Sequence, residues 1–201
     1  MKFINSLNLL KRIQKHKNRW KDCQLCPLSE KRYKVVLYRG NIPSDVLLIS
    51  EAPGQSEDVI GKPFVGPAGS VLDNIMLSAR AMPGTPHFTF SVTSIVSCIP
   101  LDVEGTIRQP HKLEVIACQD RLIEYIDIAN PSLIVTLGKV SKNKFPPQLD
   151  TPIKSLIHPA AILRLNQVRA DIETARCISY LARWIGRYCG ETKSGSNSTK
   201  T

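Results

Sequence analysis

The sequence predicts an α/β fold, a three-layer α/β/α sandwich around a central four-stranded parallel sheet. Two observations support this prediction. Short apolar runs bounded by Pro, Gly, Asn or Asp are continuous, which is typical of strands buried on both faces. Helical patterns separate these runs, and strands that alternate with helices form parallel sheets through right-handed crossovers. A chain of 201 residues without an internal repeat fits one domain, which we place at residues 1–189.

The predicted elements alternate along the chain. An amphipathic helix is expected at 3–20, where apolar and basic positions interleave. The strands are expected at 46–50, 88–96, 133–137 and 153–157, and the other helices at about 69–81, 111–129, 139–145 and 160–188. The last helix carries an apolar stripe made of Leu165, Val168, Ile172, Ala175, Ile178, Ala182 and Ile185. The polar residues 190–201 are expected to form a disordered tail.

The chain is strongly basic, with a formal net charge of +10 and a pI near 9.5. Basic residues gather at 11–21 and along the last predicted helix. Such an excess either keeps a surface solvated or binds a polyanion, because each neutralised phosphate releases a counterion. We expect nucleic acid as the partner. No apolar run approaches the roughly 18 residues of a membrane span, and no signal-peptide pattern opens the chain, so we expect no membrane association and a cytoplasmic protein.

Four of the six cysteines form a candidate metal site. Cys23 and Cys26 make a C-x2-C pair, and Cys98 and Cys118 come from a distant segment. Thiolates from two segments can hold a metal ion or an iron–sulfur cluster that joins them. Zinc and [4Fe–4S] both accept four cysteines, so ligand count does not separate them, and buried or free thiols remain the alternative. Cys177 and Cys189 fit a helical pattern and are expected to be core or surface thiols.

Three polar side chains are expected at the carboxyl ends of the predicted strands, where open parallel sheets bind ligands. They are Glu51, Ser94 and His158. A lone histidine is often structural, but Pro159 keeps His158 out of a helix at the mouth of the sheet. The sequence therefore predicts a ligand site at this edge.

The long loop after the first strand is the second candidate feature. Its Pro-Gly turn exposes backbone amides, and Gly66, Gly69 and Ser70 lead into a helix N-terminus suited to a phosphate. The alternative is a connection that is merely rich in Gly and Pro. Phe64 in this loop is either a core anchor or a flat surface on which a base stacks.

At these residues the chain resembles the iron–sulfur (family 4) branch of the uracil-DNA glycosylase superfamily. The resemblance covers about residues 20–185 and includes the order of the four cysteines. Its motifs are Glu51-Ala52-Pro53-Gly54, Glu57-Asp58, Gly61-x-Pro63-Phe64-Val65-Gly66-x-Ala68-Gly69, residues 133–138 and His158-Pro159-Ala160.

The resemblance implies a monomeric, monofunctional DNA glycosylase. Such an enzyme flips a nucleotide from DNA into a pocket and hydrolyses the N-glycosidic bond, leaving an abasic site. The resemblance also implies that Cys23, Cys26, Cys98 and Cys118 ligate a [4Fe–4S] cluster that supports the fold and does no redox work. A non-catalytic iron–sulfur DNA-binding protein is the competing interpretation.

The resemblance assigns roles to individual residues. Glu51 would support the attacking water or the sugar cation, and His158 would donate to the base O2 as the base leaves. The remaining implied contacts are base-binding for Ala52, Gly54, Glu57, Phe64 and Ser94, and DNA-binding for Gly66, Gly69, Ser70, Ala161 and Arg164. Among these, Phe64 would stack under the base, Glu57 would bar a bulky C5 group, and the segment from Ala161 to Arg164 would be a wedge.

Two residue departures from the family pattern and one difference in length bear on substrate choice. Ser50 stands where the family usually has Gly, and Ser94 stands where an Asn side chain reads the pyrimidine edge. A serine hydroxyl is shorter and discriminates less than an amide. The segment between Cys98 and Cys118 also exceeds the usual length. These departures favour a pocket that admits uracil or a C5-modified pyrimidine, and an enzyme for modified bases would suit defence against phages.

Overall fold

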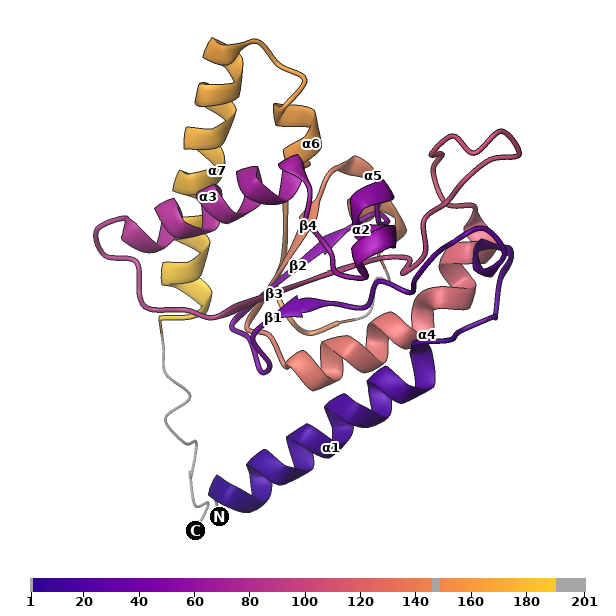
Figure 1. Ribbon diagram of the computed structural model, residues 1–201. Helices are drawn as coiled ribbons and strands as arrows, with labels where there is room; N and C mark the ends of the chain where they lie inside the picture. The colour runs from indigo at the N-terminus through magenta and orange to yellow at the C-terminus, as the bar shows by residue number, and fades with distance from the viewer. Residues whose placement is uncertain (1, 146–148, 191–201) are drawn as a thin grey trace.

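The computed structural model describes residues 2–145 and 149–190, with side chains described from Ser6 onward. Its centre is a five-stranded sheet in the order β1-β3-β2-β4-β5 (Figure 1). The strands are β1 Arg39–Gly40, β2 Val46–Ser50, β3 Phe90–Ser94, β4 Leu133–Leu137 and β5 Ile153–Leu156. β2 to β5 are mutually parallel, and β1 pairs antiparallel with β3. The predicted α/β class and its four parallel strands are confirmed.

The sheet differs from the prediction by one additional strand and in the limits of two others. β1 is an additional edge strand of two residues, too short to leave a pattern in the sequence. β3 is two residues shorter than predicted at each end, and β5 ends at Leu156, one residue before the predicted limit. Beyond β3, the amide of Ile95 still donates to the carbonyl of Ser50 at 2.8 Å. In the β2–β3 register, Ser50 lies opposite Ser94.

Helices cover both faces of the sheet, which confirms the three layers. Successive residues of a strand point to opposite faces. Leu48 and Val135 pack with α3 (Pro67–Ala81), α6 (Pro159–Ile162) and α7 (Gln167–Tyr188). Leu47 and Ile134 pack with α4 (Lys112–Ala129) on the other face.

The amphipathic helix α1 (Lys2–Trp20) lies outside the three layers and packs on α4 (Figure 1). The predicted helix over 3–20 is therefore confirmed. The Nη2 atom of Arg12 reaches Asp127 Oδ2 of α4 at 2.5 Å, and Trp20 Nε1 donates to Glu124 at 2.7 Å. Among the described residues no helix combines the length and the apolar character of a membrane span.

The single helix expected over 160–188 is wrong at its start. α6 ends at Ile162, and α7 begins after Asn166, whose side chain accepts from the amide of Arg169 at 3.1 Å. Asparagine is a preferred N-cap, so the second helix starts where this side chain satisfies a free amide. The predicted stripe is also wrong over the first turns, since Val168 and Ile172 are 69% and 52% exposed.

Further along α7, Cys177, Leu181 and Ile185 are buried against the sheet. Cys177 is therefore a core thiol, which was one of the two expected alternatives. Cys189 is half-buried and packs against the same cluster. The expected disordered tail falls, apart from Gly190, outside the described residues.

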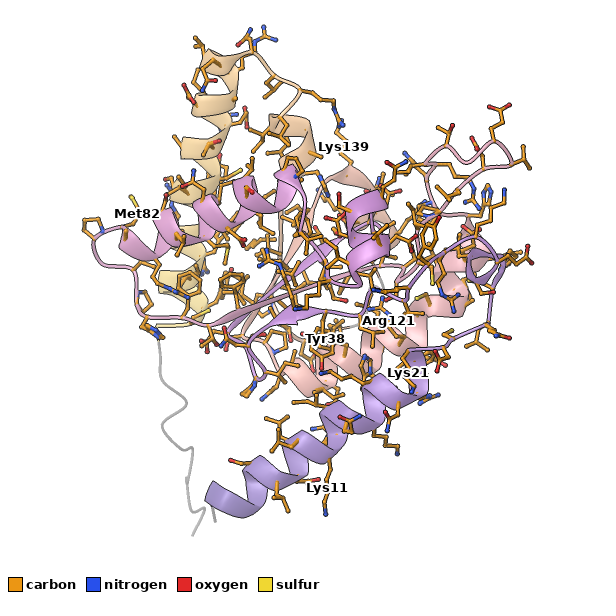
Figure 2. All side chains as sticks on the ribbon, viewed as in Figure 1. Lys11, Lys21, Tyr38, Met82, Arg121 and Lys139 are labelled. Atoms are coloured by element: carbon orange, nitrogen blue, oxygen red, sulfur yellow. The ribbon has the colours of Figure 1, made fainter. Side chains whose placement is uncertain are left out.

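Three short helices shape the loops. α2 (Gln55–Ile60) lies in the long loop after β2 and was not predicted, whereas α5 (Lys139–Lys144) agrees with the predicted helix. A 3-10 helix, Pro27–Ser29, follows the first cysteine pair. All side chains around these loops are drawn in Figure 2.

Candidate active site

A cavity of about 1050 Å³ opens at the carboxyl ends of the parallel strands. The last residues of β2, β3, β4 and β5 all line it, as the rule for open parallel sheets predicts. It also takes in the expected catalytic, base-binding and wedge residues, namely Glu51, Ala52, Gly54, Glu57, Phe64, Ser94, His158, Ala161 and Arg164.

Glu51 faces this cavity without a neutralising partner. Its Oε1 atom is buried and makes no hydrogen bond to a described residue. Burial raises the pKa of the Glu51 carboxyl, and the positive charge of Lys144 opposes that rise. A buried carboxylate without such a partner can accept a hydrogen bond from a water molecule or stabilise a nearby positive charge.

The imidazole of His158 is fixed by the first turn of α6. Its Nδ1 accepts from the amide of Ala160 at 3.1 Å, so in the neutral ring the proton lies on Nε2. Burial lowers the pKa of His158, Arg164 lowers it further, and Glu57 opposes both. The ring is therefore neutral at pH 7 and can donate through Nε2–H.

Phe64 packs beside His158 in a strained backbone. The two ring centroids are 5.7 Å apart at an interplanar angle of 28°. Phe64 has φ +55°, a left-handed conformation that large side chains rarely adopt. A Cβ on Gly69 would come within 2.0 Å of the Phe64 carbonyl oxygen, so glycine at 69 lets α3 hold this conformation. Phe64 is thus a core residue that also forms a pocket wall.

Glu57 ties the two ends of the long loop together. Its Oε2 accepts from the amide of Gly54 at 3.1 Å, while Oε1 accepts from the amides of Val65 and Gly66 at 3.0 and 3.2 Å. The carboxylate therefore holds the loop closed around Phe64 and also faces the cavity.

The two departures from the family pattern are in contact with each other. Ser50 and Ser94 are buried, and their hydroxyl oxygens are 2.8 Å apart at the cavity wall. One hydroxyl donates to the other, so the pair presents a single hydroxyl proton and several lone pairs to the cavity. This pairing depends on the β2–β3 register and cannot be read from the separate positions in the sequence.

Several cavity residues were not predicted as site residues. Ile107, Arg108 and Gln109 come from the segment between Cys98 and Cys118, and Lys139 and Lys142 come from α5. The lysines follow a strand end, which was a usable signal. The unusual length of the segment between Cys98 and Cys118 pointed to the pocket, but the individual residues Ile107, Arg108 and Gln109 had no local signal, because their place depends on long-range folding.

Arg108 is held by a forked ion pair. Its Nη1 and Nη2 atoms donate to the two Glu114 oxygens at 2.9 and 2.6 Å, which lowers the pKa of the Glu114 carboxyl. Glu114 also accepts from the amide of His111 at 2.7 Å. These bonds fix one edge of the cavity to the start of α4.

The predicted phosphate site lies beside the cavity, not in its wall. Gly66, Gly69 and Ser70 are absent from the cavity lining that the described residues form. The amides of Gly69 and Ser70 donate to the carbonyl of Gly66 at 2.8 and 3.3 Å, and the Gly66 amide is taken by Glu57. Phosphate binding at this helix start stays a prediction.

The four predicted cysteines converge. Cys23, Cys26, Cys98 and Cys118 all line one small cavity between α4 and the loop that follows α1, together with Arg32 and Arg121. Burial raises the pKa of the Cys98 thiol to about 12, and the Arg32 guanidinium opposes that rise. Within the described ranges, no group of three or more His, Cys, Asp or Glu is spaced for a single metal ion.

Comparisons with known proteins point to one family. The family model described as the uracil DNA glycosylase superfamily matches residues 37–182. A type-4 uracil-DNA glycosylase of Pyrobaculum aerophilum is 30% identical over 80% of this chain and 89% of its own length. That of Saccharolobus solfataricus is 32% identical over 67% of this chain, and that of Thermotoga maritima is 34% identical over 63%. The matches span 59% and 62% of the lengths of these two relatives.

Proposed function

Because this chain belongs to the uracil-DNA glycosylase superfamily, we propose that it is a monofunctional DNA glycosylase for uracil or a C5-modified pyrimidine. It would flip the nucleotide into the 1050 Å³ cavity and hydrolyse the bond between C1′ and the base. The observation that carries this proposal is the placement of a neutral, Nε2-protonated His158 and an unpartnered Glu51 in the same cavity.

His158 would stabilise the leaving base. When the C1′–N1 bond breaks, its electron pair goes to the base, and negative charge develops on the base O2. The Nε2–H of His158 can donate to that oxygen without a prior change of protonation, since Nδ1 is already occupied. A fixed donor aimed at developing charge is the largest kind of electrostatic contribution in such reactions.

Glu51 would act on the sugar side. As the base departs, C1′ becomes positive, and the carboxylate of Glu51 stabilises that charge or orients the water that adds to C1′. The missing partner of its Oε1 atom is consistent with a place kept for a water or the sugar. The added water loses one proton and the departed base anion gains one, so the products are the neutral free base and an abasic site.

The Ser50–Ser94 pair supports a broadened choice of base. An asparagine amide offers a fixed donor and a fixed acceptor, whereas the serine pair offers a hydroxyl proton that can rotate. A site that requires fewer hydrogen bonds rejects analogues less strongly. A base enlarged at C5 would still have to pass Glu57, whose carboxylate is fixed by three loop amides.

We propose that the four-cysteine cavity is the site of an anionic cofactor, a [4Fe–4S] cluster. Cys23, Cys26, Cys98 and Cys118 would be its ligands. The structural support is the donor set together with Arg32, whose Nη1 is buried without a partner among the described residues. When bound, such a cluster would join the segment after α1 to α4 and contribute folding free energy.

One experiment tests the activity directly. Duplexes carrying a single uracil, a C5-modified uracil or a C5-modified cytosine are incubated with the protein, and abasic sites are then cleaved with alkali. Cleavage of at least one duplex by wild type and loss of cleavage in His158→Ala are expected. Wild type that binds all duplexes but cleaves none would favour the non-catalytic DNA-binding protein. Iron and acid-labile sulfide in the same preparation test the cofactor separately.

A further inference from the structure

Arg121 is a buried cation without a carboxylate partner. It lies in α4, one turn after Cys118, and its side chain is 1% exposed. No ion pair joins it to an acidic group of the described residues, and Glu124, one turn further on, binds Trp20 and Arg19 instead. Burying an unpaired charge costs several kcal/mol, so an anion must compensate it.

Arg121 adjoins the four cysteines. Arg121 lines the same cavity as the four cysteines, and its Nε is buried without a partner in the described part of the chain. Arg32 lines that cavity too, with Nη2 donating to the carbonyl of Cys23 at 2.6 Å. Two guanidinium groups thus adjoin four thiols. A cluster with four thiolate ligands carries net negative charge, which matches this arrangement.

The other side of Arg121 holds the end of β3. Nη1 donates to Thr93 Oγ1 at 2.8 Å, and Nη2 donates to the carbonyl of Ser94 and, at 2.9 Å, to that of Ile95. The planar fork of arginine suits three convergent acceptors better than a lysine ammonium does.

The same segment carries the active-site wall. The amide of Ile95 donates to the carbonyl of Ser50 at 2.8 Å, and the amide of Val96 donates to the carbonyl of Glu51 at 3.1 Å. Hydrogen bonds therefore link Arg121, which lines the cysteine cavity, through residues 94–96 to the backbone of Ser50 and Glu51.

We propose that Arg121 is a positioning residue that couples the cysteine-bound cofactor to the pocket: its charge balances the bound centre, and its fork fixes Ser94 and Glu51. The inference rests on the proposed cofactor and reaction. In this arrangement the bound anion does more than stabilise the fold, because it also keeps Arg121 in the orientation that positions Ser94 and Glu51.

Two substitutions separate the charge of Arg121 from its hydrogen bonds. Arg121→Gln removes the charge and should lower the reduction potential of the bound cluster, because a nearby cation favours the more negative, reduced state. It should also speed iron loss to a chelator several-fold. Arg121→Lys keeps the charge, so the reduction potential of the bound cluster should stay near that of the wild-type protein. Without the fork, its single-turnover excision rate should fall by about tenfold to a hundredfold, with DNA affinity little changed.

Arg80→Gln is the matched control. The Arg80 guanidinium also donates to a backbone carbonyl, that of Phe88 at 2.8 Å, but it lines neither the active-site cavity nor the cysteine cavity. It should leave the potential, the iron-loss rate and excision unchanged. If Arg121→Gln does not fold, Arg32→Gln tests the charge argument, because it removes a cation from the same cavity and should shift the potential in the same direction.

Each outcome is informative. Wild-type potential and iron loss in folded Arg121→Gln would overturn the charge coupling, and wild-type excision in Arg121→Lys would overturn the positioning role. Active wild-type protein that contains zinc, or no metal, would instead refute the proposed cluster. Iron-loaded wild type that excises no base would refute the proposed reaction while leaving the potential measurement valid.

Discussion

At the scale of single residues, the site depends on how each polar atom is engaged by its neighbours. His158 cannot turn its Nδ1 toward a substrate without losing the hydrogen bond from the Ala160 amide. The Nε2–H group is therefore the one that can donate to a substrate. Glu51 is the reverse case, because its Oε1 atom has no hydrogen-bond partner in the part of the chain that the structure describes. The chemistry follows from this contrast between a fixed donor and a free acceptor.

His158→Ala should lower the single-turnover excision rate by about a hundredfold to a thousandfold, as loss of a donor to a developing anion does elsewhere. Affinity for DNA should change little, because this contact strengthens mainly in the transition state. Rapid-quench kinetics at saturating enzyme measure the rate, and fluorescence anisotropy measures the affinity. An unchanged rate would place the active site elsewhere.

The pH dependence follows from the two shifted groups. The pKa of Glu51 is raised above its ordinary value of 4.5, and that of His158 is lowered below 6.5. The proposed reaction uses the Glu51 carboxylate and the neutral His158 ring, which are the deprotonated forms. The rate should therefore rise with pH through the Glu51 pKa and fall on acidification. In Glu51→Gln the rate should be low, and the part of the acid limb due to Glu51 should vanish. A wild-type rate that is flat into the acid range would contradict this assignment.

Ser94→Asn together with Ser50→Gly should shift preference toward plain uracil. Glycine at 50 makes room for the longer amide, and the amide restores a fixed donor and acceptor. The measurement is the ratio of kcat/KM for uracil and for a C5-modified pyrimidine.

Ser44→Gly is the control for this substitution, because Ser44 and Ser91 form a second buried hydroxyl pair, also 2.8 Å apart, outside the cavity lining. It should leave that ratio unchanged. If wild type excises uracil alone and the double substitution does not alter that preference, the serine pair is a neutral replacement.

At the scale of elements, the break between α6 and α7 shapes the proposed wedge. The turn at 163–166 leaves Leu163 half-exposed and places Arg164 at the cavity. In a continuous helix over 160–188, these two side chains would lie on the regular surface of that helix and not at a turn. The Asn166 cap therefore contributes to the shape of the proposed wedge.

Arg164→Ala should weaken DNA binding and also slow excision, because the residue belongs both to the charged surface and to the wedge. Arg169→Ala, just inside α7 and outside the cavity lining, should affect binding alone. Titrations and single-turnover rates of the two variants are compared. Equal effects of both on excision would argue against a wedge at this turn.

At the scale of the whole molecule, two groups of basic residues lie in separate regions, and further arginines lie along α7. Lys139, Lys142 and Arg164 line the cavity. The basic residues at 11–21 belong mostly to α1, which lies beyond α4 and away from α5 and α6 in the view of Figure 1; Figure 2 labels Lys11 and Lys139 on these two regions. The net charge of +10 is thus divided over distant surfaces.

The salt dependence of DNA binding should distinguish these regions. Affinity should fall steeply with salt, and each phosphate contact removed should lower the log–log slope by about one. Lys139→Ala with Lys142→Ala should reduce the slope more than Lys11→Ala with Lys15→Ala, which serves as a charge-matched control. A larger effect of the α1 pair would place the DNA along α1.

The sequence by itself determined the parts of this protein that depend on local pattern. β2 and β4 agree with prediction to the residue, because continuous apolar runs between turn residues have few alternatives. Glu51, Phe64 and His158 were assigned from their short motifs. The convergence of the four cysteines was expected from spacing and resemblance, and the structure places them together.

Only the tertiary structure decided the contacts between distant segments. Ser50 and Ser94 pair across 44 positions, and Arg121 reaches back to Thr93 across 28. When two hydrogen-bonded residues lie on different elements, the local sequence around either residue does not indicate the pairing. Strand register and helix packing, which sum many weak apolar contacts over the whole chain, bring these polar atoms within bonding distance.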